Sequence, residues 1–171
     1  HRVAQLLEEA SRHTADSAEL LLASAALYQR SGDVARAADI LAQSGAALQE
    51  RALAPGAYAA YSRAAELAPG GEEFEQSVFQ ALTAAHQAQL PHEALSLLDR
   101  SATRLQSSLR LSGEQRAEIE VISAEVRRLM FHDAGHLSAH CRDLLKRGEL
   151  THDQQLRVAL AGVTAAEHDA D

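Results

Sequence analysis

The sequence predicts an all-α fold of about nine helices, packed as antiparallel hairpins in one helical-repeat domain over residues 1–171. Ala and Leu carry most of the apolar content, and both are strong helix formers. Hydrophobic residues make up 46% of the chain, while nine Gly and three Pro leave few interruptions. No run of alternating β-branched residues predicts a strand. These observations favour short, closely packed helices over any fold that contains a sheet.

The first predicted element is a short helix within residues 1–14, which can also be read as a linker helix from a preceding domain. A second helix is expected from Asp16 to about Arg30. Asp16 and Glu19 have the spacing of a capping box, in which each side chain bonds the other residue's backbone amide. The apolar residues of the first helix share one face: Val3, Leu6, Leu7 and Ala10.

The turn at residues 31–33, Ser-Gly-Asp, is a strong local signal. Gly32 can adopt the left-handed backbone conformation that a sharp helix exit requires. Asp33 can cap a third helix, expected over about residues 34–51, and its charge suits the positive end of the helix dipole. The Ala-Pro-Gly tripeptide at residues 54–56 is expected to break this helix.

The middle of the chain predicts three more helices. The fourth is expected over about residues 57–67, and the sequence Ala-Pro-Gly-Gly at residues 68–71 is its stop signal. The fifth begins at Glu72, and the sixth begins at Pro91, because proline suits the first turn of a helix. The residues expected to face inward are Phe74, Val78, Ala81, Leu82 and Ala85 in the fifth helix and Leu95, Leu98, Ala102 and Leu105 in the sixth.

The last third of the chain predicts a seventh, an eighth and a ninth helix. The spacings of Ser112 with Gln115 and of Thr151 with Gln154 indicate capped starts for the seventh and ninth helices. Gly135 is expected to lie in the turn before the eighth. The expected inward faces are Ile119, Ile122, Val126 and Leu129 in the seventh; Leu137, Leu144 and Leu145 in the eighth; and Leu156, Ala159, Leu160 and Val163 in the ninth.

Aligning the turns reveals a recurring position and a second one four residues later. The first is occupied by Ala37, Ala57, Ala94 and His140, and the second by Leu41, Tyr61, Leu98 and Leu144. A small residue early in the second helix of each hairpin resembles the tetratricopeptide repeat, whose period is about 34 residues. The resemblance implies a right-handed solenoid, and the uneven spacings here imply degenerate repeats. The alternative is a plain α-helical bundle.

Two segments carry a more particular resemblance. They are residues 56–69, GAYAAYSRAAELAP, and residues 91–99, PHEALSLLD. Both are similar to the helical-repeat region of large ATP-binding regulators of the LuxR family, which lies between an ATPase module and a C-terminal DNA-binding domain. The opening His-Arg-Val-Ala at residues 1–4 also resembles the start of that region. The resemblance covers residues 1–147.

This resemblance implies that the chain is a fragment of a cytoplasmic transcription regulator, and that it serves as the sensor and scaffold arm. Such an arm receives a small-molecule inducer or a protein partner and passes the event to neighbouring domains. The sequence has no GxxxxGK[ST] phosphate loop and no basic recognition helix. We therefore expect ATP and DNA to bind to other domains of the parent protein, and we expect no cofactor in this chain.

Charge and composition exclude several classes of partner. The net charge of −8 argues against direct nucleic-acid contact, which requires a basic surface. The basic pairs Arg127-Arg128 and Lys146-Arg147 are interpreted as charges that suit helix C-termini. No apolar run approaches the roughly 20 residues of a membrane span. The single cysteine, Cys141, fits a reducing cytoplasm.

A solenoid exposes a groove along one side, and the repeat pattern predicts which residues line it. Phe79 and His86 are the best candidates for contact with a partner, because they lie seven residues apart on one helical face. The alternative for Phe79 is a place in the core. The full set predicted to face the groove is Gln29, Gln49, Phe79, Thr83, His86 and His132.

A metal site and an active site are both disfavoured. His132, His136, His140 and Cys141 are residue types that bind zinc. However, the turn expected at Gly135 would leave His132 at a helix end, His136 in the turn and His140 in a packing position. We therefore favour no metal site. No serine, histidine or aspartate lies in a recognisable nucleophile motif, so we expect no enzyme activity.

Three hypotheses of function follow. The first is a non-catalytic regulatory module that binds a protein or a ligand within a LuxR-family regulator. The second is a stand-alone tetratricopeptide-like adaptor, and the third is a sensor of a metal or small ligand. Self-association through the end helices is also expected, because a solenoid without terminal caps leaves an apolar face exposed.

Overall fold

The computed structural model describes residues 1–14, 16–106, 111–130 and 134–168. All regular structure in these residues is helical, which confirms the all-α class and the expected number of helices. The helices are α1 (Arg2–Ser11), α2 (Ser17–Arg30), α3 (Val34–Glu50), α4 (Ala54–Leu67), α5 (Glu72–Gln87), α6 (Pro91–Gln106), α7 (Gly113–Leu129), α8 (Ala134–Arg147) and α9 (His152–His168).

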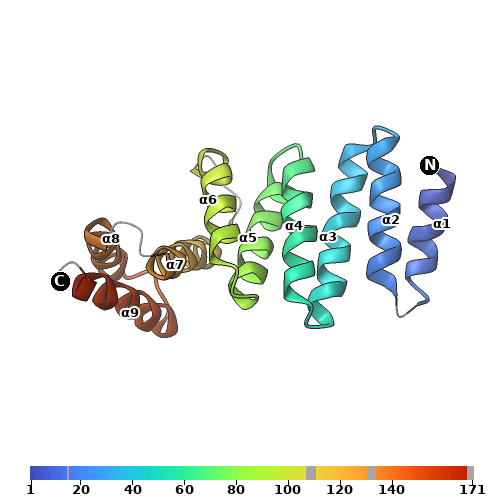
Figure 1. Cartoon of the computed structure of the whole chain (residues 1–171). Coiled ribbons are helices and arrows are strands. Elements are labelled where there is room, and N and C mark those ends of the chain that lie inside the picture. Colours follow the sequence, from blue (N-terminus) through green and yellow to red (C-terminus); the bar gives the residue numbers. More distant parts are fainter. Residues whose placement is uncertain (15, 107–110, 131–133, 169–171) are drawn as a thin grey trace.

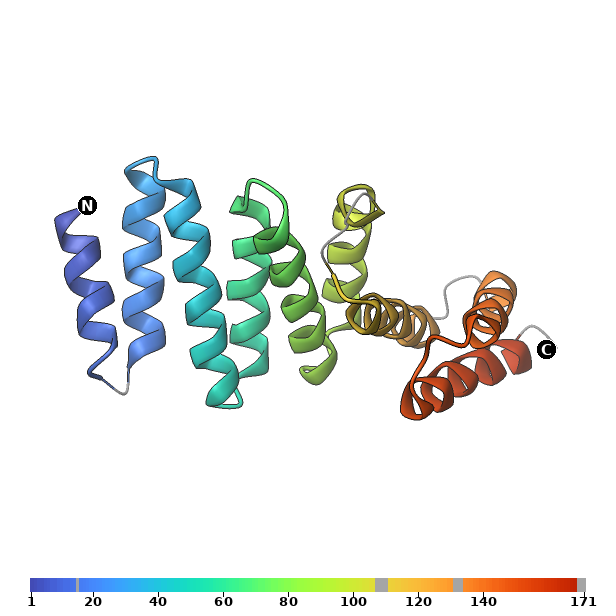
Figure 2. The ribbon, with the colours of Figure 1, turned by 180° about the vertical axis from the view of Figure 1, so that it is seen from behind.

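The first six helices stand side by side in a row, each running against its neighbour (Figures 1 and 2). Helix α7 crosses the end of this row and is seen nearly end-on in Figure 1. The hairpin of α8 and α9 lies beyond α7, so the two ends of the chain are at opposite ends of the molecule. None of the described helices is both long enough and apolar enough to cross a membrane.

Contacts between alternate helices define two sides of the row. Helix α3 touches α5, α5 touches α7, and α7 touches α9. Among the described residues, no pair of even-numbered helices packs as closely. We call α3, α5, α7 and α9 the odd-helix layer. This alternation is what a stack of helix hairpins produces, whereas the right-handed solenoid itself stays a prediction.

Small residues allow the helices of the row to approach closely. Ala37, Ala57 and Ala94, which share the recurring position in the sequence, are all fully buried. Gly45 of α3 lies against the ring of Tyr61 in α4, and a Cβ atom added to this glycine would come within 2.9 Å of the ring. A glycine is therefore required here by packing, and Tyr61 fills the space that its missing side chain leaves.

Three turns of the row share one hydrogen-bonding pattern. Helices α2, α3 and α5 are each followed, two residues after their last residue, by a left-handed backbone: Gly32 (φ +84°), Ala52 (φ +56°) and Gln89 (φ +55°). In each turn, the amide of the following residue donates to the carbonyl five residues earlier, at 2.9–3.0 Å. This is the Schellman motif, which usually has glycine at the left-handed position. The prediction for Gly32 is confirmed, and two non-glycine residues occupy the same conformation elsewhere.

The predicted helix starts are mostly confirmed. The amide of Arg36 donates to Asp33 Oδ1 at 3.2 Å, and Ser112 and Gln115 form both bonds of a capping box. Thr151 and Gln154 make the same reciprocal pair. The capping box expected at Asp16 is wrong, because the Asp16 side chain accepts no cap hydrogen bond.

Two predicted helix breaks are also wrong. Helix α4 begins at Ala54, so Pro55 and Gly56 lie in its first turn, where a proline costs no hydrogen bond. Helix α8 begins at Ala134, so Gly135 and His136 lie inside that helix. His140 is exposed instead of packing, because the buried stripe of α8 is Leu137, Cys141 and Leu144.

The predicted inward face of α9 is turned to solvent. Leu156, Leu160 and Val163 are 59%, 63% and 57% exposed. A different stripe of α9 is buried, because it packs against Leu137, Cys141 and Leu144 of α8. This buried stripe consists of Val158, Ala161 and Ala165.

Smaller register corrections apply to three other helices. In α6, Ala102 is exposed, while Leu95 and Leu105 are only half-buried. Leu129 of α7 and Leu145 of α8 are also exposed. The inward residues of α6 are Ala94, Leu97, Leu98 and Ser101.

Helix α1 exposes an apolar stripe at the opposite end of the molecule, through Val3 and Leu6. Its other side is fixed to the row by Glu8, a buried carboxylate that pairs with Arg36 of α3 and accepts a hydrogen bond from Tyr28 of α2. Both end helices therefore present apolar side chains outward, as expected for a helical stack without caps.

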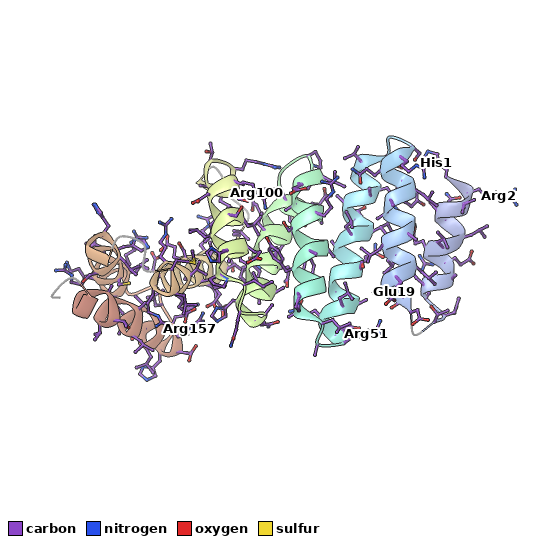
Figure 3. All side chains as sticks on the ribbon, in the orientation of Figure 1. His1, Arg2, Glu19, Arg51, Arg100 and Arg157 are labelled. Carbon is purple, nitrogen blue, oxygen red and sulfur yellow. The ribbon has the colours of Figure 1, made fainter. Side chains whose placement is uncertain are left out.

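Exposed ion pairs connect neighbouring parts of the row (Figure 3). Arg51 Nη1, at the end of α3, lies 3.6 Å from Glu19 Oε1 of α2. Arg100 Nη1 of α6 lies 2.8 Å from Glu66 Oε1 of α4. Ion pairs as exposed as these contribute little to the free energy of unfolding. The contacts between buried alanine and leucine side chains therefore hold the row together.

Candidate functional site

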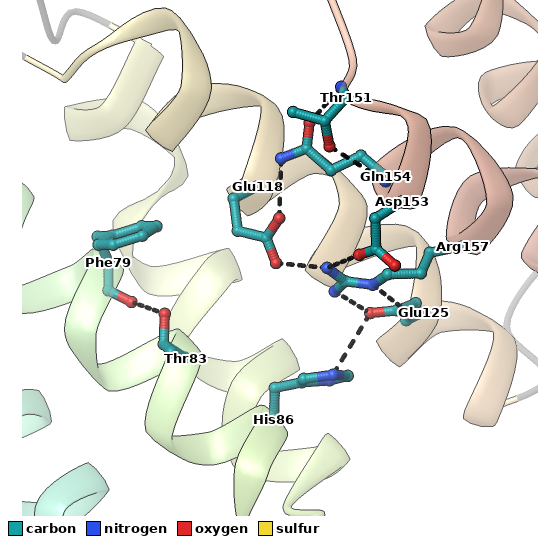
Figure 4. Close-up of polar contacts among 9 residues, drawn as sticks. All are labelled: Phe79, Thr83, His86, Glu118, Glu125, Thr151, Asp153, Gln154 and Arg157. Carbon is teal, nitrogen blue, oxygen red and sulfur yellow. Dashed lines mark hydrogen bonds and ion pairs between the residues drawn. The ribbon is translucent and has the colours of Figure 1, made fainter. Parts of the chain in front are cut away.

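Helix α5 presents three of the predicted groove residues together on the odd-helix layer. Phe79, Thr83 and His86 lie along one side of the helix, and all three are half-buried. The Thr83 hydroxyl donates to the Phe79 carbonyl at 3.0 Å (Figure 4). This side of α5 therefore offers an aromatic ring, the hydroxyl and methyl groups of a threonine, and an imidazole within two helical turns.

A different side of α5 packs into the core, which leaves these residues accessible. Phe74, Val78 and Leu82 form the buried stripe of this helix. The Arg104 guanidinium of α6 lies over the Phe74 ring, 3.5 Å from its centre, which is a cation–π contact. Because the apolar stripe is committed to this core, Phe79 belongs to its edge and contributes to both the packing and the surface.

Arg157 of α9 lies at the centre of a polar cluster at the end of the odd-helix layer (Figure 4). Its Nε and Nη2 atoms donate to the two oxygens of Glu125 at 2.9 and 2.6 Å. Its Nη1 atom donates to Glu118 Oε1 at 2.7 Å, and the Gln154 amide donates to the other Glu118 oxygen at 2.9 Å. The hydrogen bonds to Glu125, together with the one to Glu118, raise the pKa of Arg157 above its ordinary value. We call these residues, together with His86, the junction cluster.

His86 joins α5 to the junction cluster. Its Nε2 atom lies 3.7 Å from Glu125 Oε2, an ion pair only when the imidazole is protonated. The cluster thus contacts three helices of the odd-helix layer: α5, α7 and α9. Because the Arg157 guanidinium of α9 bonds to both carboxylates of α7, the cluster ties these two helices together.

A cleft lies next to His86, between the end of α5, the start of α6 and the C-terminal half of α7. Its volume is about 730 Å³. This volume falls in the range of roughly 300–1,000 Å³ that is typical of ligand sites. The residues that line the cleft are Ala85, His86, Gln87, Gln89, Leu90, Pro91, Val126, Arg128 and Leu129.

A smaller pocket of about 140 Å³ lies between α3 and α5. Its surface is mostly apolar and includes Ala38, Ala42 and Tyr61, although Asp39 and Glu73 also line it. These two pockets, both formed by described residues, therefore flank the central part of α5.

The remaining predicted groove residues do not join this group. Gln29 is exposed on α2, outside the odd-helix layer. Gln49 lies near the end of α3, where its Oε1 atom accepts a hydrogen bond from the Tyr61 hydroxyl at 3.3 Å. His132 lies outside the described residues.

The candidate metal ligands are not drawn together where the structure describes them. His136 and His140 are exposed on α8, while Cys141 is buried on another side of that helix. Burial raises the pKa of the Cys141 thiol, which disfavours the thiolate that binds metals. Over residues 1–14, 16–106, 111–130 and 134–168, no three potential ligands cluster.

Sequence reasoning missed the junction cluster and Arg128. Arg157 is 32 residues from Glu125 and 39 from Glu118, so no local motif connects them. Arg128 was expected only to suit the end of a helix.

No protein-family model, no curated protein and no solved structure matches this chain.

Proposed function

We propose that this chain is a non-catalytic binding module that receives a protein partner or a ligand on its odd-helix layer. The observation that supports the proposal is the accessible side of α5, where Phe79, Thr83 and His86 lie between two pockets. A ring and several polar groups on a rigid helix suit recognition, because an aromatic side chain supplies contact area at low entropic cost.

The parent protein in this proposal is a LuxR-family ATP-binding transcription regulator, and the chain is its sensor and scaffold arm. The support is the resemblance of residues 56–69 and 91–99 to the helical region of that family. ATP and DNA then bind to other domains. The genomic reading frame tests this placement. An ATPase phosphate loop upstream and a helix-turn-helix downstream would support it, and a start and a stop codon directly at the two ends would contradict it.

The second candidate is a stand-alone adaptor that connects two proteins. It is favoured by the apolar stripes of α1 and α9, which lie at opposite ends of the molecule. An adaptor with two docking faces binds two partners at once, whereas a sensor arm uses its odd-helix layer. The two candidates therefore predict that different substitutions abolish partner binding.

Capture of proteins from an extract of the source cells, quantified by mass spectrometry, tests the binding proposal. Phe79→Ala and Thr83→Lys alter the accessible side of α5, and His92→Ala alters an exposed residue of α6 as the control. We expect the same proteins to be captured by the native chain and the control, but lost from both α5 variants. Circular dichroism melting must show that each variant is folded. Capture that survives both α5 variants but is lost with Leu6→Glu and Leu160→Glu would favour the adaptor.

A further inference from the structure

The cleft between α5 and α7 differs in charge from the rest of the molecule. The chain has 24 acidic and 16 basic residues, with a net charge of −8. Within the part of the chain that the structure describes, no carboxylate lines this cleft, although Arg128 and His86 do. Glu125, the neighbour of Val126 in the sequence, is held by Arg157 on α9. A basic cleft on an acidic molecule is a local inversion of charge that suits an anionic ligand.

Among the described residues, Arg128 has no counterion. Four arginines are half-buried among the described residues: Arg36, Arg127, Arg128 and Arg157. Arg36 and Arg157 are paired with carboxylates, and Arg127 donates to the Ser123 hydroxyl at 3.4 Å. The described structure gives Arg128 no hydrogen bond and no ion pair. The N–H groups of a half-buried guanidinium normally have hydrogen-bond partners, because its five donors are costly to desolvate.

The rest of the cleft is apolar or neutral. Leu129 is 48% exposed, a large exposure for a leucine, and it lines the cleft next to Arg128. Val126, Leu90 and Pro91 add apolar surface, and two glutamine amides add neutral polar groups. A ligand that fits this lining carries a carboxylate for Arg128 and an aliphatic group for Leu129.

The geometry points to an acidic peptide segment of a partner protein, with an aliphatic side chain beside a carboxylate, as the occupant of this cleft. A peptide is favoured because the cleft adjoins His86, where the accessible side of α5 begins, so that one extended segment can lie across both. The inference rests on the proposed binding function and names the chemistry of the partner. Bidentate hydrogen bonds from a guanidinium to a carboxylate would provide orientation as well as affinity.

Fluorescence anisotropy with defined peptides tests the inference. The probe is a short fluorescein-labelled peptide in which Asp and Leu alternate, and the reference peptides replace Asp with Asn or with Lys. We expect the acidic peptide to bind about tenfold or more tightly than the Asn peptide. Equal binding of the two, or no saturable binding of the acidic peptide, would overturn the inference.

Substitutions separate the cleft from general electrostatic attraction. Arg128→Gln is expected to weaken binding of the acidic peptide by about tenfold, and Arg128→Glu to reverse the preference towards the Lys peptide. Arg30→Gln is the control, because Arg30 is also an arginine in the last turn of a helix but is exposed and is not among the residues that line the cleft. Leu129→Ser should also weaken binding, at little cost in stability because this leucine is already exposed. Equal losses with Arg30→Gln and Arg128→Gln would contradict the proposal.

Two further outcomes identify alternatives. If hexanoate binds as tightly as the peptide or more tightly and displaces it, the ligand of the cleft is a small aliphatic carboxylate. This result would overturn the peptide as the proposed occupant. Partner capture that is lost with Phe79→Ala and retained with Arg128→Gln and Arg128→Glu would leave the proposed function intact and refute the role of the cleft.

Discussion

Arg157 of α9 and Glu125 of α7 form a two-pronged ion pair, with both guanidinium–carboxylate distances between 2.6 and 2.9 Å. The pair is only partly buried, since the two side chains are 23% and 15% exposed. It fixes α9, and with it the α8–α9 hairpin, to α7. Glu125 also stays within reach of His86 on α5. Stability at this end of the molecule and the accessibility of the candidate site therefore depend on the same residues.

Replacement of Arg157 by Gln is expected to destabilise the chain by about 1–3 kcal/mol. The substitution leaves Glu118 and Glu125 close together without a counterion, although water near the site reduces the cost below that of a fully buried pair. Urea unfolding gives the free energy, and hydrogen exchange should show faster opening of α9 than of α3. Lys146→Gln is the control, because its pair with Asp143 is exposed. An equal, negligible effect of both substitutions would contradict this link between α7 and α9.

Gly45→Ala is expected to lower the free energy of unfolding by about 1–2 kcal/mol. The new Cβ would lie 2.9 Å from the Tyr61 ring, and the overpacking exceeds the gain in helix propensity of about 1 kcal/mol. Gly113→Ala is the matched control, because nothing lies within 4 Å of that position. Addition of Tyr61→Leu should make Gly45→Ala tolerable, and strictly additive effects of the two substitutions would refute the contact.

Tyr61 is expected to make stability fall at alkaline pH. Burial, followed by the negative charge of Glu50, raises the pKa of this phenol above the ordinary value of 10.0. A raised pKa means that the folded state holds the proton more tightly than the unfolded state does. The contribution of Tyr61 is therefore complete below pH 10.0 and is lost as the pH rises through the folded-state pKa. Tyr61→Phe should flatten this part of the stability profile, with urea unfolding as the measurement and Tyr58→Phe as the control.

The two non-glycine residues with left-handed backbones are expected to be sites of stabilisation. Ala52→Gly and Gln89→Gly should each raise the free energy of unfolding by about 0.5–1 kcal/mol, because glycine adopts this conformation without steric cost. Gly32→Ala should have the opposite effect. Ala88→Gly is the control, since Ala88 has a right-handed backbone (φ −81°) and should lose stability instead. Thermal melting of the four variants provides the comparison.

The exposed stripes of the end helices are expected to cause weak self-association at high protein concentration. Leu160→Glu and Leu6→Glu introduce charge on these faces without disturbing the core, because both leucines are mostly exposed. Sedimentation equilibrium should show a lower average mass for the double variant than for the native chain. A native chain that remains monomeric at all concentrations would contradict this expectation.

Several helix starts and turns could be predicted from the sequence because their causes are local. Asp33, Ser112 and Gln115 bond to amides within three residues, so the residue types and spacing are sufficient. The inward face of α9 could not be predicted in this way. Its sequence offers two apolar stripes, and the choice depends on the surfaces of α7 and α8, which bury Val158 and Ala161 and leave Leu160 outside.

The candidate site was predictable only in part, for the same reason. Phe79, Thr83 and His86 share one helix, and helical periodicity alone places them on one side. The junction cluster depends on the tertiary arrangement, because its members come from helices that are distant in the sequence. The interest of Arg128 depends on the lack of a counterion among the described residues around it, and a sequence alone does not reveal such a lack.

The position of α7 gives the molecule a mechanical consequence. Among the described residues, the α8–α9 hairpin packs closely on α7 and on none of the six helices of the row. Within the described structure, the hairpin is therefore attached to the other helices mainly through α7. A rotation of α7 about its own axis would therefore carry the α8–α9 hairpin with it, and the end of α9 farthest from that axis would be displaced most.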